Sequence, residues 1–82
     1  MSETLRLRGY IAVVKKEISD LDTKISAQII LIRNLADPYK EDVENLKTKE
    51  LKAAAEQLDT FVEQLREKKE RLETLNKELG NG

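Results

Sequence analysis

The sequence predicts an all-α protein built as an antiparallel two-helix hairpin, a coiled coil folded back on itself. Ala, Glu, Lys, Leu and Arg together supply 44 of the 82 residues, a share typical of coiled coils and long helices. Apolar residues recur every seven positions in both halves of the chain. The single proline, Pro38, stands between the halves, and the residue before a proline is driven out of the helical conformation. Two helices separated near Pro38 are therefore expected.

The first helix is expected over residues about 3–35, and its apolar pattern forms one continuous seam. The pattern has two rows seven residues apart, which are Thr4, Ile11, Ile18, Ile25 and Ile32, and Leu7, Val14, Leu21, Gln28 and Leu35. These are the a and d positions of a heptad repeat, with one polar d position. Gly9 costs about 1 kcal/mol relative to Ala inside a helix, so it marks either the true start of the helix or a close crossing.

The second helix is expected over residues about 42–79, after a turn at about 36–42. Its main row is Leu51, Leu58, Leu65, Leu72 and Leu79, and the accompanying row three positions earlier is Thr48, Ala55, Val62, Lys69 and Asn76. Asp37 can cap this helix with Pro38 in its first turn, or Asp42 can cap a helix that begins at Val43; the sequence leaves both open. Gly80 is expected to close the helix, with 80–82 frayed. The whole chain, 1–82, is then a single domain.

A fold centred on Pro38 also predicts which residues face each other. It places Ile11 opposite Leu65, Ile18 opposite Leu58, and Gln28 opposite Thr48 as a polar layer that fixes the register. A slip of seven residues keeps the apolar rows paired, but it moves the turn away from Pro38 and separates the polar pair, so the unshifted register is expected. One continuous helix kinked at Pro38 is the alternative, and it would leave both seams without a partner.

Apolar residues outside the two seams predict a further contact, because a two-helix hairpin buries only its a and d positions. Ile30 lies opposite the seam, in a stretch near the turn that is apolar on all sides. We therefore expect a homodimer that forms a four-helix bundle, although scattered surface apolar residues are also normal. The sequence leaves open whether the apolar cluster near the turn contacts a second copy or a different protein. The expected interface consists of Tyr10, Val13, Ile29, Ile30, Leu31, Tyr39, Val43, Leu46, Ala54, Phe61 and Leu75.

Composition also narrows the functional classes. The chain has no Cys and no His, which excludes thiol nucleophiles, serine-histidine catalysis and the usual zinc or haem ligands. We expect no enzymatic activity, no cofactor and no metal. Acidic residues do gather at Asp37, Glu41, Asp42 and Glu44, but the glycine-turned spacing of a calcium loop is missing, and carboxylates at a helix start explain them better.

The expected function is thus non-enzymatic protein–protein interaction or assembly, as in a small chaperone, an adaptor or a structural subunit. The alternative is a nucleic-acid-binding hairpin whose contacts lie at the end that holds both termini, namely Arg6, Arg8, Lys68, Lys69 and Arg71. Acidic residues interleave with these cations and the net charge is −1, so nucleic-acid binding is less favoured. The longest aliphatic run, Ile29 to Ile32, is too short to cross a membrane, and a cytoplasmic location is expected.

Overall fold

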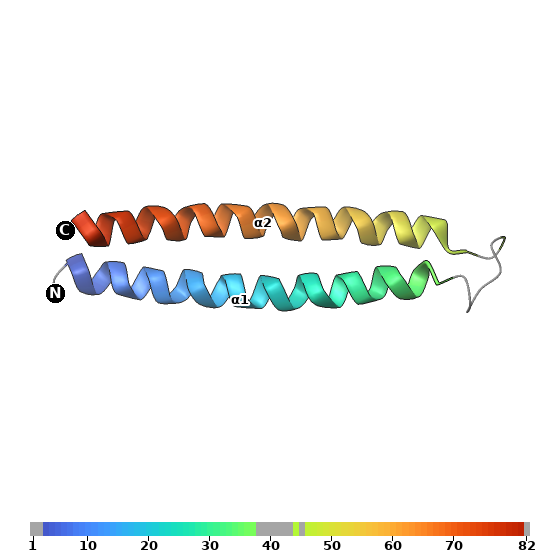
Figure 1. Ribbon diagram of the computed structural model, residues 1–82, viewed down its shortest axis with the longest axis horizontal. Helices are drawn as coiled ribbons and strands as arrows, with labels where there is room; N and C mark the ends of the chain where they lie inside the picture. The colour runs from blue at the N-terminus through green and yellow to red at the C-terminus, as the bar shows by residue number, and fades with distance from the viewer. Residues whose placement is uncertain (1–2, 38–43, 45, 82) are drawn as a thin grey trace.

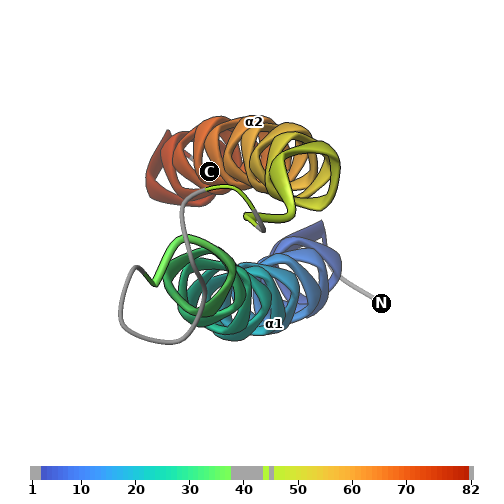
Figure 2. The same cartoon turned by 90° about the vertical axis from the view of Figure 1, so that its right-hand side faces the viewer.

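Two long helices lie side by side and antiparallel, and they form nearly the whole molecule (Figure 1). The structure, a computed structural model, describes residues 3–37, 44 and 46–81, and within them it contains α1 (Glu3–Leu35) and α2 (Thr48–Asn81) and no strand. The rod measures 61 × 15 × 14 Å, and the view along it shows α1 and α2 lying side by side (Figure 2). Its radius of gyration of 18.5 Å far exceeds the roughly 12 Å of a compact domain of this length. The all-helical prediction is confirmed.

The first helix has the predicted bounds, whereas the second begins later than predicted. The first helical hydrogen bond of α2 runs from the Leu51 amide to the Lys47 carbonyl, 2.9 Å apart. The predicted start at about 42 is therefore too early, and neither Asp37 nor Asp42 caps a helix that begins at Thr48; Asp42 and Val43 themselves lie outside the described residues. Because α1 ends at Leu35, an earlier start would extend α2 beyond its partner, where its apolar face could not pack.

The two described glycines are ordinary helical residues. Neither Gly9 nor Gly80 has a positive φ, and a Cβ atom built on either meets nothing within 4 Å. Gly9 therefore marks neither a helix start nor a close crossing. Gly80 does not close α2, which continues to Asn81, so the predicted cap at this position is wrong.

The core is a single seam between the helices. On α1 the predicted rows are correct, with Ile11, Val14 and Leu21 buried. On α2 the Leu row lies in the seam as predicted and is half-buried. The row that packs beside it is not the predicted one. Ala54 and Leu75 are only 6% and 2% exposed, and the other two members of their row, Phe61 and Lys68, are half-buried. Of the predicted row, only Val62 is half-buried, and the exposed members are Thr48, Ala55, Lys69 and Asn76.

This difference arises from the rotation of α2 about its own axis. Both candidate rows flank the Leu row, so either can complete an apolar stripe. The row that includes Phe61 and Leu75 offers larger apolar side chains than the row that includes Thr48 and Asn76, and burying apolar area is the dominant favourable term.

The register also differs from the prediction. Leu75 packs in one cluster with Ile11 and Val14, whereas the predicted register placed Leu65 opposite Ile11. Gln28 contacts α2 at Ala54 rather than at Thr48. The partners on α2 are thus displaced by roughly one heptad toward its C-terminus, the slip that still pairs apolar rows. The cause is the position of the connection, which spans 36–47 and is not centred on Pro38.

A cysteine pair placed across the observed seam should test this register. Ile11→Cys with Leu75→Cys should form an intrachain disulfide in dilute oxidising solution, since both side chains belong to one buried cluster. The matched pair Ile18→Cys with Leu58→Cys, which the Pro38-centred register would favour, should form it at least ten-fold more slowly. The measurement is the rate of the mobility shift on a non-reducing gel. Faster closure of the second pair would contradict the observed register.

Gly9 offers a second test, of stability. Gly9→Ala should raise the free energy of unfolding by about 0.5–1 kcal/mol, because the site is helical, exposed and open to a methyl group. Thermal unfolding followed by circular dichroism measures the change. Gly80→Ala, one residue before the end of α2, serves as the control and should have a smaller effect. Destabilisation by Gly9→Ala would mean that another surface approaches α1 at this point.

Candidate functional site

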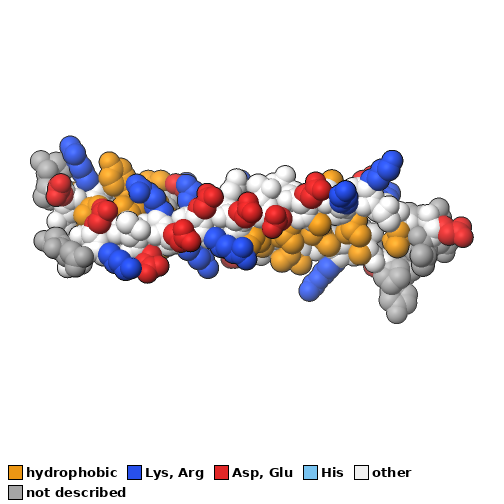
Figure 3. All heavy atoms as spheres, turned by 90° about the horizontal axis from the view of Figure 1, so that it is seen from above, with side chains coloured by type: hydrophobic (Ala, Val, Ile, Leu, Met, Phe, Trp, Pro, Cys, Tyr) orange, Lys and Arg blue, Asp and Glu red, His pale blue; other side chains and the backbone are white. Residues whose placement is uncertain are grey.

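The hairpin leaves several large apolar side chains in contact with solvent. Three of them are consecutive near the end of α1: Ile29, Ile30 and Leu31 are 39%, 58% and 45% exposed. Leu5, Tyr10 and Val13, near the end that holds both termini, are also exposed. Figure 3 shows hydrophobic side chains gathered between the middle of the rod and its turn end on the face in view. Tyr10, Val13 and Ile29 to Leu31 all belong to the predicted interface.

Other members of the predicted interface lie elsewhere. Ala54 and Leu75 are buried against α1, so their predicted place on an outer side is wrong. Phe61 is half-buried, and the Nζ atom of Lys24 lies 5.9 Å from the centroid of its ring. The reason is the rotation of α2, which turns this row into the seam. Leu46 is half-buried, and Tyr39 and Val43 lie outside the described residues.

One long flank of the hairpin is rich in charge. Glu17 of α1 forms an ion pair with Lys68 of α2, with 2.5 Å between Oε2 and Nζ. The shallow groove around this pair is lined by Glu17, Asp20, Leu21, Lys24, Gln64, Glu67 and Lys68. A second groove on this flank, at the end with both termini, includes Tyr10 and Glu78. We call this side the charged flank.

The opposite flank is different in its turn half. Helical periodicity places two rows of residues on this flank. On α1 they are the residues one position after the row Leu7 to Leu35, and on α2 they are the row with Ala55 and Val62, which the seam does not use. They include Ile29 of α1 and Ala55 and Val62 of α2; Ile29 and Ala55 are exposed and Val62 is half-buried. We call this set, Ile29, Ala55 and Val62, the apolar flank. It combines residues from both helices into one surface.

Gln28 makes a polar contact between the two helices. Its side-chain amide Nε2 donates a hydrogen bond to the backbone carbonyl of Ala54, with 2.8 Å between the two atoms. The sequence identified Gln28 as a polar seam residue, but it assigned the wrong partner, because Thr48 is exposed. A backbone acceptor leaves no sequence signal, since every residue carries a carbonyl group.

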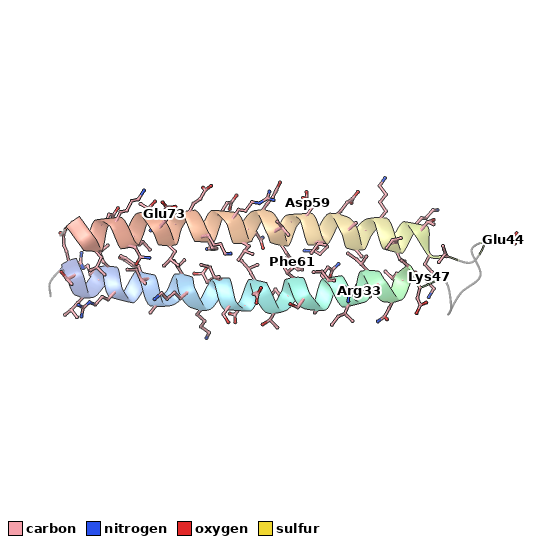
Figure 4. The ribbon with its side chains drawn as sticks, in the orientation of Figure 1. Arg33, Glu44, Lys47, Asp59, Phe61 and Glu73 are labelled. Atoms are coloured by element: carbon pink, nitrogen blue, oxygen red, sulfur yellow. The ribbon has the colours of Figure 1, made fainter. Side chains whose placement is uncertain are left out.

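The candidate nucleic-acid residues do not form an isolated basic surface. Arg6, Arg8, Lys69 and Arg71 are exposed, whereas Lys68 is paired with Glu17. Nearby, Lys77 pairs with Glu73, with 3.2 Å between Nζ and Oε1, and Figure 4 shows Glu73 on the outer side of α2. Acidic and basic side chains alternate along the face seen in Figure 3. Such mixing weakens the positive potential that phosphate binding needs.

Two features of a chemical centre are absent from the described residues. Among them, no group of three or more acidic side chains is arranged to hold a metal ion, and no polar side chain is buried. Glu41 and Asp42 of the predicted acidic group lie outside the described residues, while Asp37 is half-buried and Glu44 exposed. Neither described helix is long and apolar enough to cross a membrane.

Comparisons with protein-family models, with curated proteins and with solved structures find no match to this chain.

Removing the donor at Gln28 should destabilise the hairpin. Gln28→Glu replaces the amide donor by a carboxylate beside the Ala54 carbonyl, which should lower the free energy of unfolding by about 1–3 kcal/mol. Gln57→Glu makes the same chemical change at an exposed position of α2 and should stay within about 0.5 kcal/mol. Urea unfolding at neutral pH measures both. Equal effects from the two substitutions would mean that the bond to Ala54 contributes nothing.

Proposed function

We propose that the chain is a non-enzymatic assembly module that acts by protein–protein contact and associates with a second copy of itself to form a four-helix bundle. The observation that supports this most strongly is the exposure of Ile29, Ile30 and Leu31. Three consecutive helical residues point in directions about 100° apart. One neighbouring helix cannot cover all three, whereas neighbours in a bundle can cover more of them.

The surface area of the hairpin supports the same proposal. Its accessible surface is 6602 Å² for a mass of 9.4 kDa, whereas a compact monomer of this mass exposes about 5,000 Å². The hairpin buries only about half of the surface of its extended chain, less than the roughly 60% of an even smaller globular domain. The excess, about 1,600 Å², is larger than the roughly 800 Å² that each partner buries in a standard interface.

The size of the core leads to the same conclusion. Among the described residues, only Ile11, Val14, Leu21, Ala54 and Leu75 are buried. Small helical domains with so few buried side chains commonly gain stability by oligomerisation. A second hairpin would add a second layer over exposed apolar residues in the turn half, such as Ile29, and form a core of four helices where the two copies overlap.

Self-association can be tested by placing charge on the exposed apolar residues. Ile29→Glu combined with Ile30→Glu should raise the dissociation constant of the dimer at least ten-fold, because each substitution occurs twice in a symmetric dimer. Sedimentation equilibrium over a range of concentrations measures the constant. The thermal midpoint of the unmodified chain should also rise with concentration.

The control carries the same charges at the other end of the same helix. Leu5→Glu combined with Ala12→Glu changes two exposed α1 residues and should leave the dissociation constant within about three-fold. A monomeric unmodified chain at about 100 μM, far above the micromolar range expected for a specific dimer, would overturn the proposal. The exposed residues would then have to bind a different protein.

A further inference from the structure

We propose that the second copy lies antiparallel across the apolar flank, so that the turn halves of the two hairpins overlap and the ends with the termini project in opposite directions. This inference rests on the proposed self-association and adds its geometry. It follows from three observations, which are the position of the apolar flank, the charges that border it, and the charges farther along the same flank.

The apolar flank lies within two helical stripes whose spacing of three and four residues keeps their members on one side. On α1 the stripe is Asp22, Ser26, Ile29 and Arg33, all exposed. On α2 it is Lys52, Ala55, Asp59 and Val62, of which only Val62 is half-buried. Both stripes lie on the opposite side of the seam from the Glu17–Lys68 ion pair. In each, small or apolar residues stand between a cation and an anion.

The stripe on α2 is complementary to a reversed copy of itself. Lys52 and Asp59 stand on either side of Ala55, three residues before it and four after it. When two such stripes meet antiparallel about Ala55, each Lys52 meets the Asp59 of the other copy. The small Ala55 side chain lets the two helices approach closely at this point. Asp59 is exposed, and Figure 4 shows it on the side of α2 away from α1.

The stripe on α1 is also complementary to a reversed copy of itself, about a point between Ser26 and Ile29. Asp22 and Arg33 stand on either side of Ser26 and Ile29, so a reversed copy brings each Arg33 toward the other copy's Asp22. The contacts between α1 and α2 place Ile29 and Ala55 at nearly the same level along the rod, since Gln28 bonds to Ala54. One two-fold axis can therefore satisfy both stripes, as a symmetric dimer requires.

Hairpins that point in the same direction would meet unfavourable charges. In that arrangement α1 of one copy faces α2 of the other, and residues at the same level along the rod come together. Lys15 and Lys69 share a level, because Glu17 pairs with Lys68, and Arg33 and Lys52 share another near the turn. Each of these like-charge contacts would occur twice in the symmetric dimer. Such like-charge contacts discriminate strongly between arrangements.

A centre at Ile29 and Ala55 also fixes the extent of the overlap. It lies well toward the turn end of helices that run from residue 3 to 35 and from 48 to 81. The cations of the other half of this flank, such as Arg8, then stay in solvent rather than against the second copy's apolar residues. The expected dimer is therefore markedly longer than the 61 Å of one hairpin. The charged residues that border Ile29 and Ala55 set its orientation.

Single cysteines at the proposed axis provide the test. Ile29→Cys and Ala55→Cys, made separately, should each give a disulfide-linked dimer, because a residue beside a two-fold axis meets its own copy. Ala12→Cys, an exposed residue on the same side of α1 but far from the axis, is the matched control. Oxidation at equal concentration, followed on non-reducing gels, should link the first two at least ten-fold faster than the control.

The outcomes separate this arrangement from self-association itself. A chain that sediments as a dimer but whose Ile29→Cys and Ala55→Cys variants link no faster than Ala12→Cys would overturn the antiparallel arrangement and leave the proposed function standing. Linking of all three at similar rates would also overturn it. A chain that sediments as a monomer would overturn both.

Discussion

The structure depends on one interaction, the burial of a single apolar stripe of α1 against a single apolar stripe of α2. No disulfide or buried ion pair contributes, since the chain has no Cys and no described charged side chain is buried. Apolar burial is non-directional, so the stripe stabilises the pair of helices without defining their relative position along the axis. That position needs a directional contact, and the bond from Gln28 to Ala54 supplies one.

The rotation of α2 decides which residues remain for a partner. The Leu row has apolar residues on both sides, and the hairpin uses the side with Ala54 and Leu75. Ala55 and Val62 are consequently left at the margin of the seam, on the same flank as Ile29. Had α2 turned the other way, Phe61 and Leu75 would have been left outside instead. The row that α2 places in the seam thus determines which of its residues join Ile29 of α1 on the apolar flank.

The sequence predicted the features that depend on local pattern. The bounds of α1, its two seam rows and the exposure of Ile29 to Leu31 follow from a strong heptad repeat interrupted once. The features it missed depend on comparing nearly equal alternatives. A Leu row that repeats every seven residues pairs equally well after a slip of one heptad. Centring the turn on Pro38 selects one of these registers, whereas the connection in the structure spans 36–47. Such alternatives differ in energy only through the sizes of the side chains that they bury and through one hydrogen bond. A repeat of apolar and polar positions contains neither of these.

The same degeneracy explains why the flanks are important. If apolar seams tolerate a slip of one heptad within a chain, they tolerate it between chains as well, and a second copy could settle at several positions. Charged residues remove this freedom, because a shift that leaves apolar contacts unchanged moves cations against cations. Exposed ion pairs contribute little to affinity, but in the proposed dimer a few ion pairs around Ile29 and Ala55 would be enough to favour one alignment. In a chain built from repeats, the apolar residues hold the helices together and the irregularities in charge select their arrangement.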